Sequence, residues 1–149
     1  MLEKQLSQAF VNIFQDYQIW TPNDRSAGWP DRGVQIGSRI VWFELKILDF
    51  DYVNMQMKIY ELSPSQAAWL AKWQRAGGYC FLFLGFIDER LRFFKYGILR
   101  CSLWHLWLKV PQQPIAIKQL VLFTDDEQEI QQWFRETFQA QGVKVSKSK

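Results

Sequence analysis

The first hydrophobic pattern in the chain is helical. Its apolar residues recur three or four positions apart, as one face of a helix requires: Leu2, Leu6, Phe10, Ile13 and Phe14. This pattern predicts an amphipathic helix over residues 2–15. A short strand over residues 17–20 should follow, and then a polar loop rich in turn-forming residues.

Two β-rich runs come next, over residues 31–36 and 39–48, and only Gly37 and Ser38 separate them. A Gly-X pair between such runs is typical of a type II′ hairpin with a two-residue turn. Residues 49–61 show no clear period. We therefore expect a loop there, with room for a short strand, that could cover a site.

A well-marked helix is predicted over residues 62–78. Ser63 can cap it, Pro64 suits its first position, and Gln66 completes a capping box. The remaining elements are expected to be a buried strand over 79–86, a strand over 90–98, a helix over 100–109, a strand over 119–123 and a final helix capped by Thr124 and Glu127. This order predicts an α/β protein with a mixed central sheet.

The composition is that of one folded domain. Of the 149 residues, 48% are hydrophobic, 22% are charged and 17% are aromatic, and we expect most of the aromatic rings in the core. No linker interrupts the chain, so residues 1–149 should form a single domain, with a flexible basic tail over residues 141–149. Two cysteines and one histidine, His105, offer neither a disulfide framework nor a histidine-based triad or metal cluster.

The sequence also bears on location. Its longest apolar run, residues 79–87, is too short to cross a bilayer. The first ten residues lack the hydrophobic region of a signal peptide. We therefore expect a cytoplasmic protein with no membrane partner.

Positive charge is unevenly distributed along the chain. The net charge is only +3, but residues 72–118 hold eight basic side chains against Asp88 and Glu89. This asymmetry favours a polyanionic partner, although an ordinary solvated surface explains it about as well. The candidates for contacts with nucleic-acid phosphates lie in the polar loop and in the strand predicted over 90–98: Arg25, Arg90, Arg92 and Lys95.

The predicted hairpin brings three charged residues to one place. With Gly37 and Ser38 in the turn, the numbers of facing residues sum to 75, so Asp31 faces Glu44. Directly opposed residues have Cβ atoms about 4.5–5.5 Å apart. Lys46 lies two positions beyond Glu44 and therefore points to the same face. The other face of the hairpin is largely apolar and suits helix packing.

Two facing carboxylates are unfavourable unless positive charge lies between them. Lys46 supplies part of that charge, and a divalent cation would supply more, because Mg²⁺ prefers a few carboxylate oxygens together with waters. The alternative is an exposed cross-strand cluster of salt bridges, which contributes little to stability. A bare P-D…E-x-K string is common by chance, but the register that matches the two acids makes the pattern more specific.

These residues resemble the motif of the PD-(D/E)xK nuclease superfamily. The layout is similar in particular to the virus-type replication-repair nucleases (VRR-NUC) and the related Holliday-junction resolvases. The matching segments are Gly28-Trp29-Pro30-Asp31, Glu44-Leu45-Lys46 and Ser63-Pro64-Ser65-Gln66. The resemblance covers residues 1–87, the motif-bearing core, and residues 88–149 would be added strands and helices.

The resemblance implies a restriction-endonuclease-like core and hydrolysis of nucleic-acid phosphodiesters with Mg²⁺ or Mn²⁺. It assigns the metal to Asp31, Glu44 and the backbone carbonyl of Leu45, and it gives Lys46 the role of orienting the attacking water. Glu3 and Gln66 match two further catalytic positions of the family. Both also have structural explanations, since Glu3 suits the helix dipole and Gln66 suits the capping box.

A metal-dependent DNA endonuclease is therefore the leading interpretation. The resolvase likeness implies action on branched DNA such as Holliday junctions, in replication, recombination or repair, and symmetric cutting would suit a homodimer. A small stand-alone nuclease also suits a virus or phage, acting in the host cytoplasm. Three alternatives stay open: RNA as the substrate, a non-catalytic nucleic-acid-binding module on the same fold, and a protein-interaction domain that uses Trp and Phe patches. The intact set of Asp31, Glu44 and Lys46 favours the nuclease.

Overall fold

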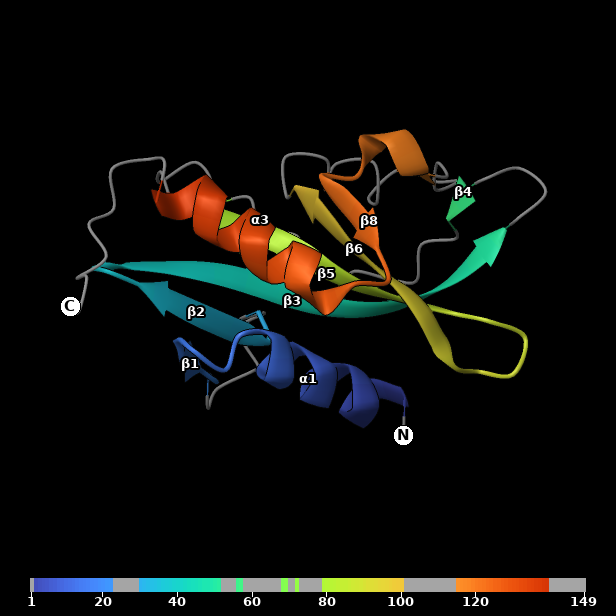
Figure 1. The fold of residues 1–149 in the computed structure, drawn as a ribbon, viewed down its shortest axis with the longest axis horizontal. Coiled ribbons are helices and arrows are strands. Elements are labelled where there is room, and N and C mark those ends of the chain that lie inside the picture. The colour runs from blue at the N-terminus through green and yellow to red at the C-terminus, as the bar shows by residue number, and fades with distance from the viewer. Residues whose placement is uncertain are drawn as a thin grey trace.

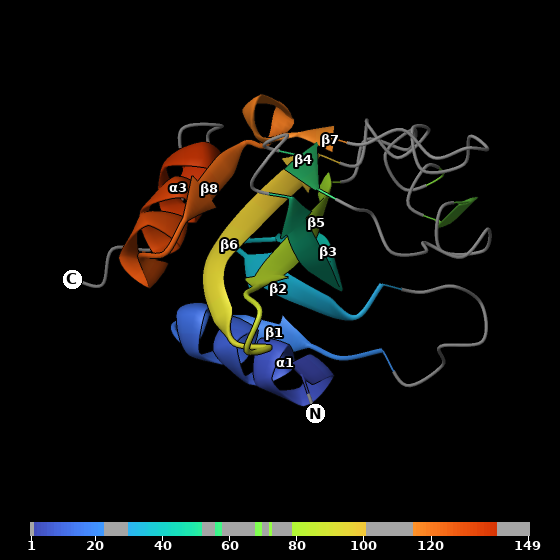
Figure 2. The same ribbon diagram turned by 90° about the vertical axis from the view of Figure 1, so that its right-hand side faces the viewer.

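The fold is built on one mixed sheet with two helices on one of its faces (Figures 1 and 2). The computed structural model describes residues 2–22, 30–51, 56–57, 68–69, 72, 79–100 and 115–139. The elements are α1 (Leu2–Ile13), β1 (Gln18–Trp20), β2 (Arg32–Ile36), β3 (Arg39–Asp51), β4 (Gln56–Met57), β5 (Tyr79–Ile87), β6 (Phe93–Arg100), β7 (Ile115–Ala116), the 3₁₀ helix η2 (Ile117–Gln119), β8 (Leu122–Thr124) and α3 (Glu127–Gln139).

The strand order of the sheet is β1-β2-β3-β5-β6-β8, with β4 beside β3 and β7 beside β4. Strands β3 and β5 are parallel, and the other pairs are antiparallel. Two parallel neighbours need a crossover connection, usually helical. Residues 68, 69 and 72, which lie between them in the chain, are helical. The α/β class and the mixed sheet expected from the sequence are confirmed.

The β2–β3 hairpin has the predicted register. Ile36 pairs with Arg39 and Val34 with Val41, and the ladder extends to Arg32 opposite Phe43. Gly37 has φ 62°, as the first turn residue of a type II′ hairpin requires. Side chains therefore alternate between the two faces along both strands as expected, as far as Arg32, the residue that follows Asp31.

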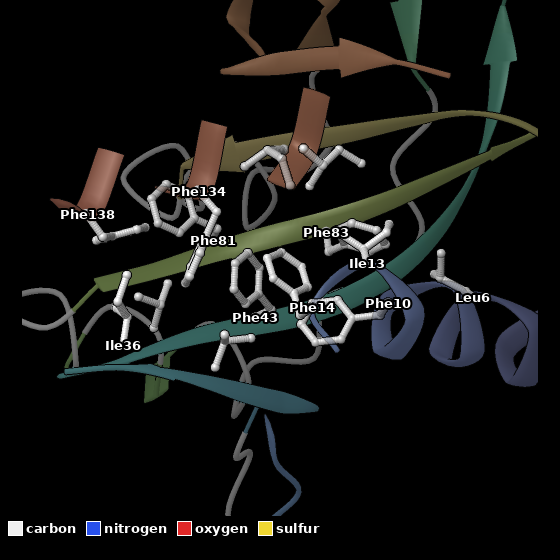
Figure 3. Close-up of a cluster of buried hydrophobic side chains, with 14 residues drawn as sticks. Leu6, Phe10, Ile13, Phe14, Ile36, Phe43, Phe81, Phe83, Phe134 and Phe138 are labelled. Carbon is white, nitrogen blue, oxygen red and sulfur yellow. The ribbon is translucent and has the colours of Figure 1, made fainter. Parts of the chain in front are cut away.

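One face of the sheet carries the main core. Helices α1 and α3 both pack on this face, where their aromatic side chains meet those of β3 and β5 (Figure 3). The Phe10 ring lies 5.2 Å from both Phe43 and Phe83. Gly85 lets α1 approach closely, because a Cβ there would lie 2.7 Å from a methyl group of Leu6. These contacts fix α1 across the middle strands.

Several predicted boundaries shift. The helix predicted over residues 2–15 ends at Ile13. The second hairpin strand runs three residues further than predicted, to Asp51. The segment after it contains the two-residue strand β4, in agreement with the short strand allowed for there. Strand β6 begins at Phe93, so the strand predicted over residues 90–98 starts too early.

The residues predicted to cap the last helix were also wrong. Asp126 accepts a hydrogen bond from the N–H of Gln128 and is the N-cap of α3, whereas Thr124 accepts one from the N–H of Asp126. Most of the helix predicted over residues 62–78 lies outside the described residues, as does the basic tail. Of the helix predicted over residues 100–109, only Arg100 is described, and it is the last residue of strand β6 rather than the start of a helix. In the described part of the chain, no helix is both long and apolar enough to span a membrane.

Candidate functional site

The three charged residues of the hairpin lie on the sheet face away from α1 and α3. Side chains alternate along β3, and Phe43 belongs to the core under the two helices. Glu44 and Lys46 therefore point to the opposite face, which they share with Trp42. The ring of Trp69, one of the helical residues between β3 and β5, lies 5.9 Å from that of Trp42. Trp69 therefore packs against the second face near the site.

Asp31 lies at the point where β2 begins. Its Oδ2 accepts a hydrogen bond of 2.9 Å from the backbone N–H of Leu45, which extends the contact between the two strands by one residue. The N–H and C=O groups of a strand residue point to the same side. The carbonyl oxygen of Leu45 therefore points to the same side of β3 as its N–H group, toward Asp31. It lies just beyond Arg32 and Phe43, the last residues that pair between β2 and β3.

Arg32 holds the backbone at this point. Its guanidinium donates one hydrogen bond of 2.8 Å to the carbonyl oxygen of Asp31 and another of 2.6 Å to the hydroxyl of Ser7 on α1. The first helix and the entrance to β2 are thereby tied together. This contact positions the backbone of Asp31.

Glu44 is the most unusual charged residue in the described structure, because it is only 1% exposed. It lies in the middle of β3, beside Leu82 of β5. Burial raises the pKa of its carboxyl group from an ordinary 4.5 to about 8, and the negative charge of Asp31 adds to that rise. The ammonium group of Lys46, with Nζ 3.7 Å from Oε2 of Glu44, and a hydrogen bond from the backbone of Asp31 oppose it.

The oxygen atoms at this edge suit a hard divalent cation. Two carboxylates from adjacent strands and one backbone carbonyl offer the oxygen ligands that Mg²⁺ takes, with waters filling the remaining positions. Among the described residues there is no group of three or more His, Cys, Asp or Glu side chains that could hold a metal. A cation here would therefore depend on Asp31, Glu44 and the carbonyl of Leu45.

Glu3, another predicted site residue, is not part of this cluster. It is exposed in the first turn of α1, and the apolar side of this helix packs on the other face of the sheet. The charges that act on the pKa of Glu44 are those of Asp31 and Lys46, not that of Glu3. Gln66 and Arg25 lie outside the described residues.

The basic residues predicted on one strand are divided between two elements. Arg90 and Arg92 lie in the turn before β6, where Arg92 forms an ion pair of 3.4 Å with Asp88. Lys95 is on β6 and lies 3.7 Å from Asp125. These three residues therefore do not form the alternating row expected of a half-exposed strand.

Arg32 and Ser7 were not singled out from the sequence. The signal for Arg32 was its place beside Val34 and Ile36 on the apolar face of the hairpin, where a charged residue needs a partner. Its partner on α1 could be found only from the packing of the helix on the sheet.

Among known proteins, neither any family model nor any curated protein matches the chain.

Proposed function

We propose that the protein is a metal-dependent endonuclease of the PD-(D/E)xK type, which hydrolyses DNA phosphodiester bonds with Mg²⁺ or Mn²⁺. The observation that supports this proposal best is the meeting of Asp31, Glu44 and Lys46 on one sheet face, at the register that the motif requires. If the match to the sequence motif were accidental, nothing would require these three side chains to lie close together.

The order of elements also supports the proposal. A helix, an antiparallel meander of three strands, a crossover and a parallel fourth strand are arranged as a restriction-endonuclease-like core would have them. In this arrangement the E-x-K strand, β3, is central and pairs with β2 on one side and β5 on the other. Its middle residues lie between paired strands on both sides, which suits a site that must hold its geometry.

Each residue of the cluster has a distinct role in the proposed reaction. Asp31 and Glu44 would hold the cation from two strands, with the Leu45 carbonyl as a third ligand. When bound, the cation would polarise the scissile phosphate and lower the pKa of a coordinated water. The Lys46 ammonium group, close to Glu44, would orient the attacking water and stabilise the negative charge that develops on the phosphorus oxygens.

The nature of the substrate follows from the resolvase likeness rather than from the site. We propose branched DNA, such as a four-way junction, as the preferred substrate in replication, recombination or repair. Two copies of the chain would then cut the two strands symmetrically. A viral or phage origin with action in the host cytoplasm belongs to the same proposal.

Cleavage of labelled DNA tests the function. The substrates are linear duplex, single strand and four-way junction, each incubated with Mg²⁺, Mn²⁺ or EDTA. We expect the wild-type protein to cut only with metal, and Asp31→Asn and Glu44→Gln to lower the rate about 100-fold or more, because each removes a ligand of the charge-stabilising cation.

Glu136→Gln is the matched control, because Glu136 is an exposed carboxylate on α3 that hydrogen-bonds only along its own helix. It should cut like the wild type. Binding of DNA without cleavage in either metal would contradict the endonuclease and favour a non-catalytic nucleic-acid-binding module. Failure to bind any of the three DNAs would favour a protein-interaction domain.

A further inference from the structure

The connection between β5 and β6 has a conformation that its sequence does not favour. The N–H of Leu91 donates to the carbonyl of Asp88, and the N–H of Asp88 donates to the carbonyl of Arg92, each at 2.9 Å. This is the pattern of a three-residue hairpin loop in which a turn is followed by a left-handed residue. The left-handed residue is Leu91, with φ 58°.

Glycine or asparagine is the residue that this position normally takes, and a bulky side chain with positive φ is an outlier. Leu91 gains no burial in return, because 60% of its surface is exposed. Together with Trp20, it is one of the two large hydrophobic side chains that are exposed in the described structure. Strain of this kind is found most often at functional positions.

The tip of the hairpin is also braced. Oδ1 of Asp88 accepts hydrogen bonds from the N–H groups of Arg90 (2.9 Å) and Arg92 (3.0 Å), and its other oxygen pairs with the guanidinium of Arg92. The hydrogen bond from Arg92 is the largest cause that holds the pKa of Asp88 below its ordinary value. Leu91 is therefore presented on a tight turn rather than on a loose loop.

The position of the tip relates it to the candidate site. Lys46 pairs with Leu84, and β5 continues from there to the turn. At about 3.3 Å per residue, Leu91 lies roughly 15–20 Å along the sheet from Lys46, which corresponds to about five base-pair steps. Figure 1 shows this hairpin, coloured yellow-green, projecting from one end of the sheet.

We propose that Leu91 is a wedge that inserts between bases of the nucleic acid whose backbone is cut at the Asp31–Glu44 site. Apolar side chains that enter a base step unstack it and kink the duplex. Arg90 and Arg92 flank the wedge and would contact the adjacent phosphates. Of the two acids in the turn, Asp88 is bound to Arg92 and Glu89 is exposed. This inference rests on the proposed function and specifies its substrate as a duplex that is easily opened at a branch or a flexible step.

The test uses Leu91→Gly, which removes the wedge and fits the left-handed conformation without strain. We expect its melting temperature to equal or exceed that of the wild type, so a loss of function would not reflect misfolding. A four-way junction carries 2-aminopurine, a base whose fluorescence rises when it unstacks, at each position four to six base pairs from the cleavage site. In EDTA, the wild type should raise the fluorescence at one of these positions, and Leu91→Gly should bind about tenfold more weakly with no rise.

Leu91→Met, which keeps an apolar side chain of similar size, should behave like the wild type. A fluorescence change that is equal for wild type and Leu91→Gly, or absent in both, would overturn the wedge. Glu44→Gln separates this outcome from failure of the nuclease: in EDTA it should raise the fluorescence of the junction as the wild type does, and with Mg²⁺ it should not cut. If the wild type binds no DNA, both proposals are overturned.

Discussion

At the scale of single residues, the turn chemistry of Gly37 and Ser38 was sufficient to predict which residues face each other. It placed Val34 opposite Val41, as the structure shows, and by extension Asp31 opposite Glu44. The burial of Glu44 could not be predicted in the same way. It depends on the parallel partner β5, and a sequence pattern within the hairpin contains no information about that partner.

The stability of the metal-free protein should fall as the pH rises through the neutral range. Glu44 has a pKa of about 8 in the folded chain and an ordinary value of 4.5, so the folded state binds its proton more tightly than the unfolded state. The stabilisation is complete below about pH 4.5 and is lost as the pH rises to about 8, with a slope of at most about 1.4 kcal/mol per pH unit. Asp31 and Lys46 are the described charged groups that act on it.

Urea denaturation in EDTA between pH 5 and 8 measures this slope. In Glu44→Gln, the contribution should vanish, because the amide does not titrate. Glu136→Gln should retain the wild-type slope, since Glu136 is exposed. Identical slopes in the wild type and Glu44→Gln would show that the buried carboxyl group is not the cause.

At the scale of elements, amphipathic periodicity predicted α1 within two residues, and turn residues predicted the hairpin. The errors came from contacts that hydrophobic periodicity does not contain, one between distant strands and one within a turn. β3 extends to Asp51 because it pairs with β5 as far as Asp49 opposite Ile87, and then with β4 at Phe50 and Asp51. Arg90 and Arg92 leave the predicted strand because Asp88 binds their N–H groups and closes the turn.

The attachment of α1 should depend on Phe10. This side chain is fully buried and packs against Phe14, Phe43 and Phe83. Phe10→Ala should lower the free energy of unfolding by about 3–5 kcal/mol, because it leaves a cavity between helix and sheet. Gln8→Ala, on the exposed side of the same helix, should cost less than about 0.5 kcal/mol. A loss for Phe10→Ala as small as that for Gln8→Ala would contradict the packing of α1 on the sheet.

At the scale of the whole molecule, the sequence predicted an α/β protein with a mixed sheet, which the structure confirms, but it did not predict the strand order. The parallel pairing of β3 and β5 places the E-x-K strand at the centre of the sheet. This placement buries Glu44 on one face while α1 and α3 cover the other. We propose that this geometry makes Asp31 and Glu44 a cation site.

Titration of the protein with Mn²⁺, followed by electron paramagnetic resonance, tests that claim without any assumption about the substrate. We expect the wild type and Glu136→Gln to bind Mn²⁺ equally, and Mg²⁺ to displace it. Asp31→Asn and Glu44→Gln should each weaken binding about tenfold or more, because each loses one carboxylate ligand. Equal affinity in all four proteins, or no binding by the wild type, would contradict the claim.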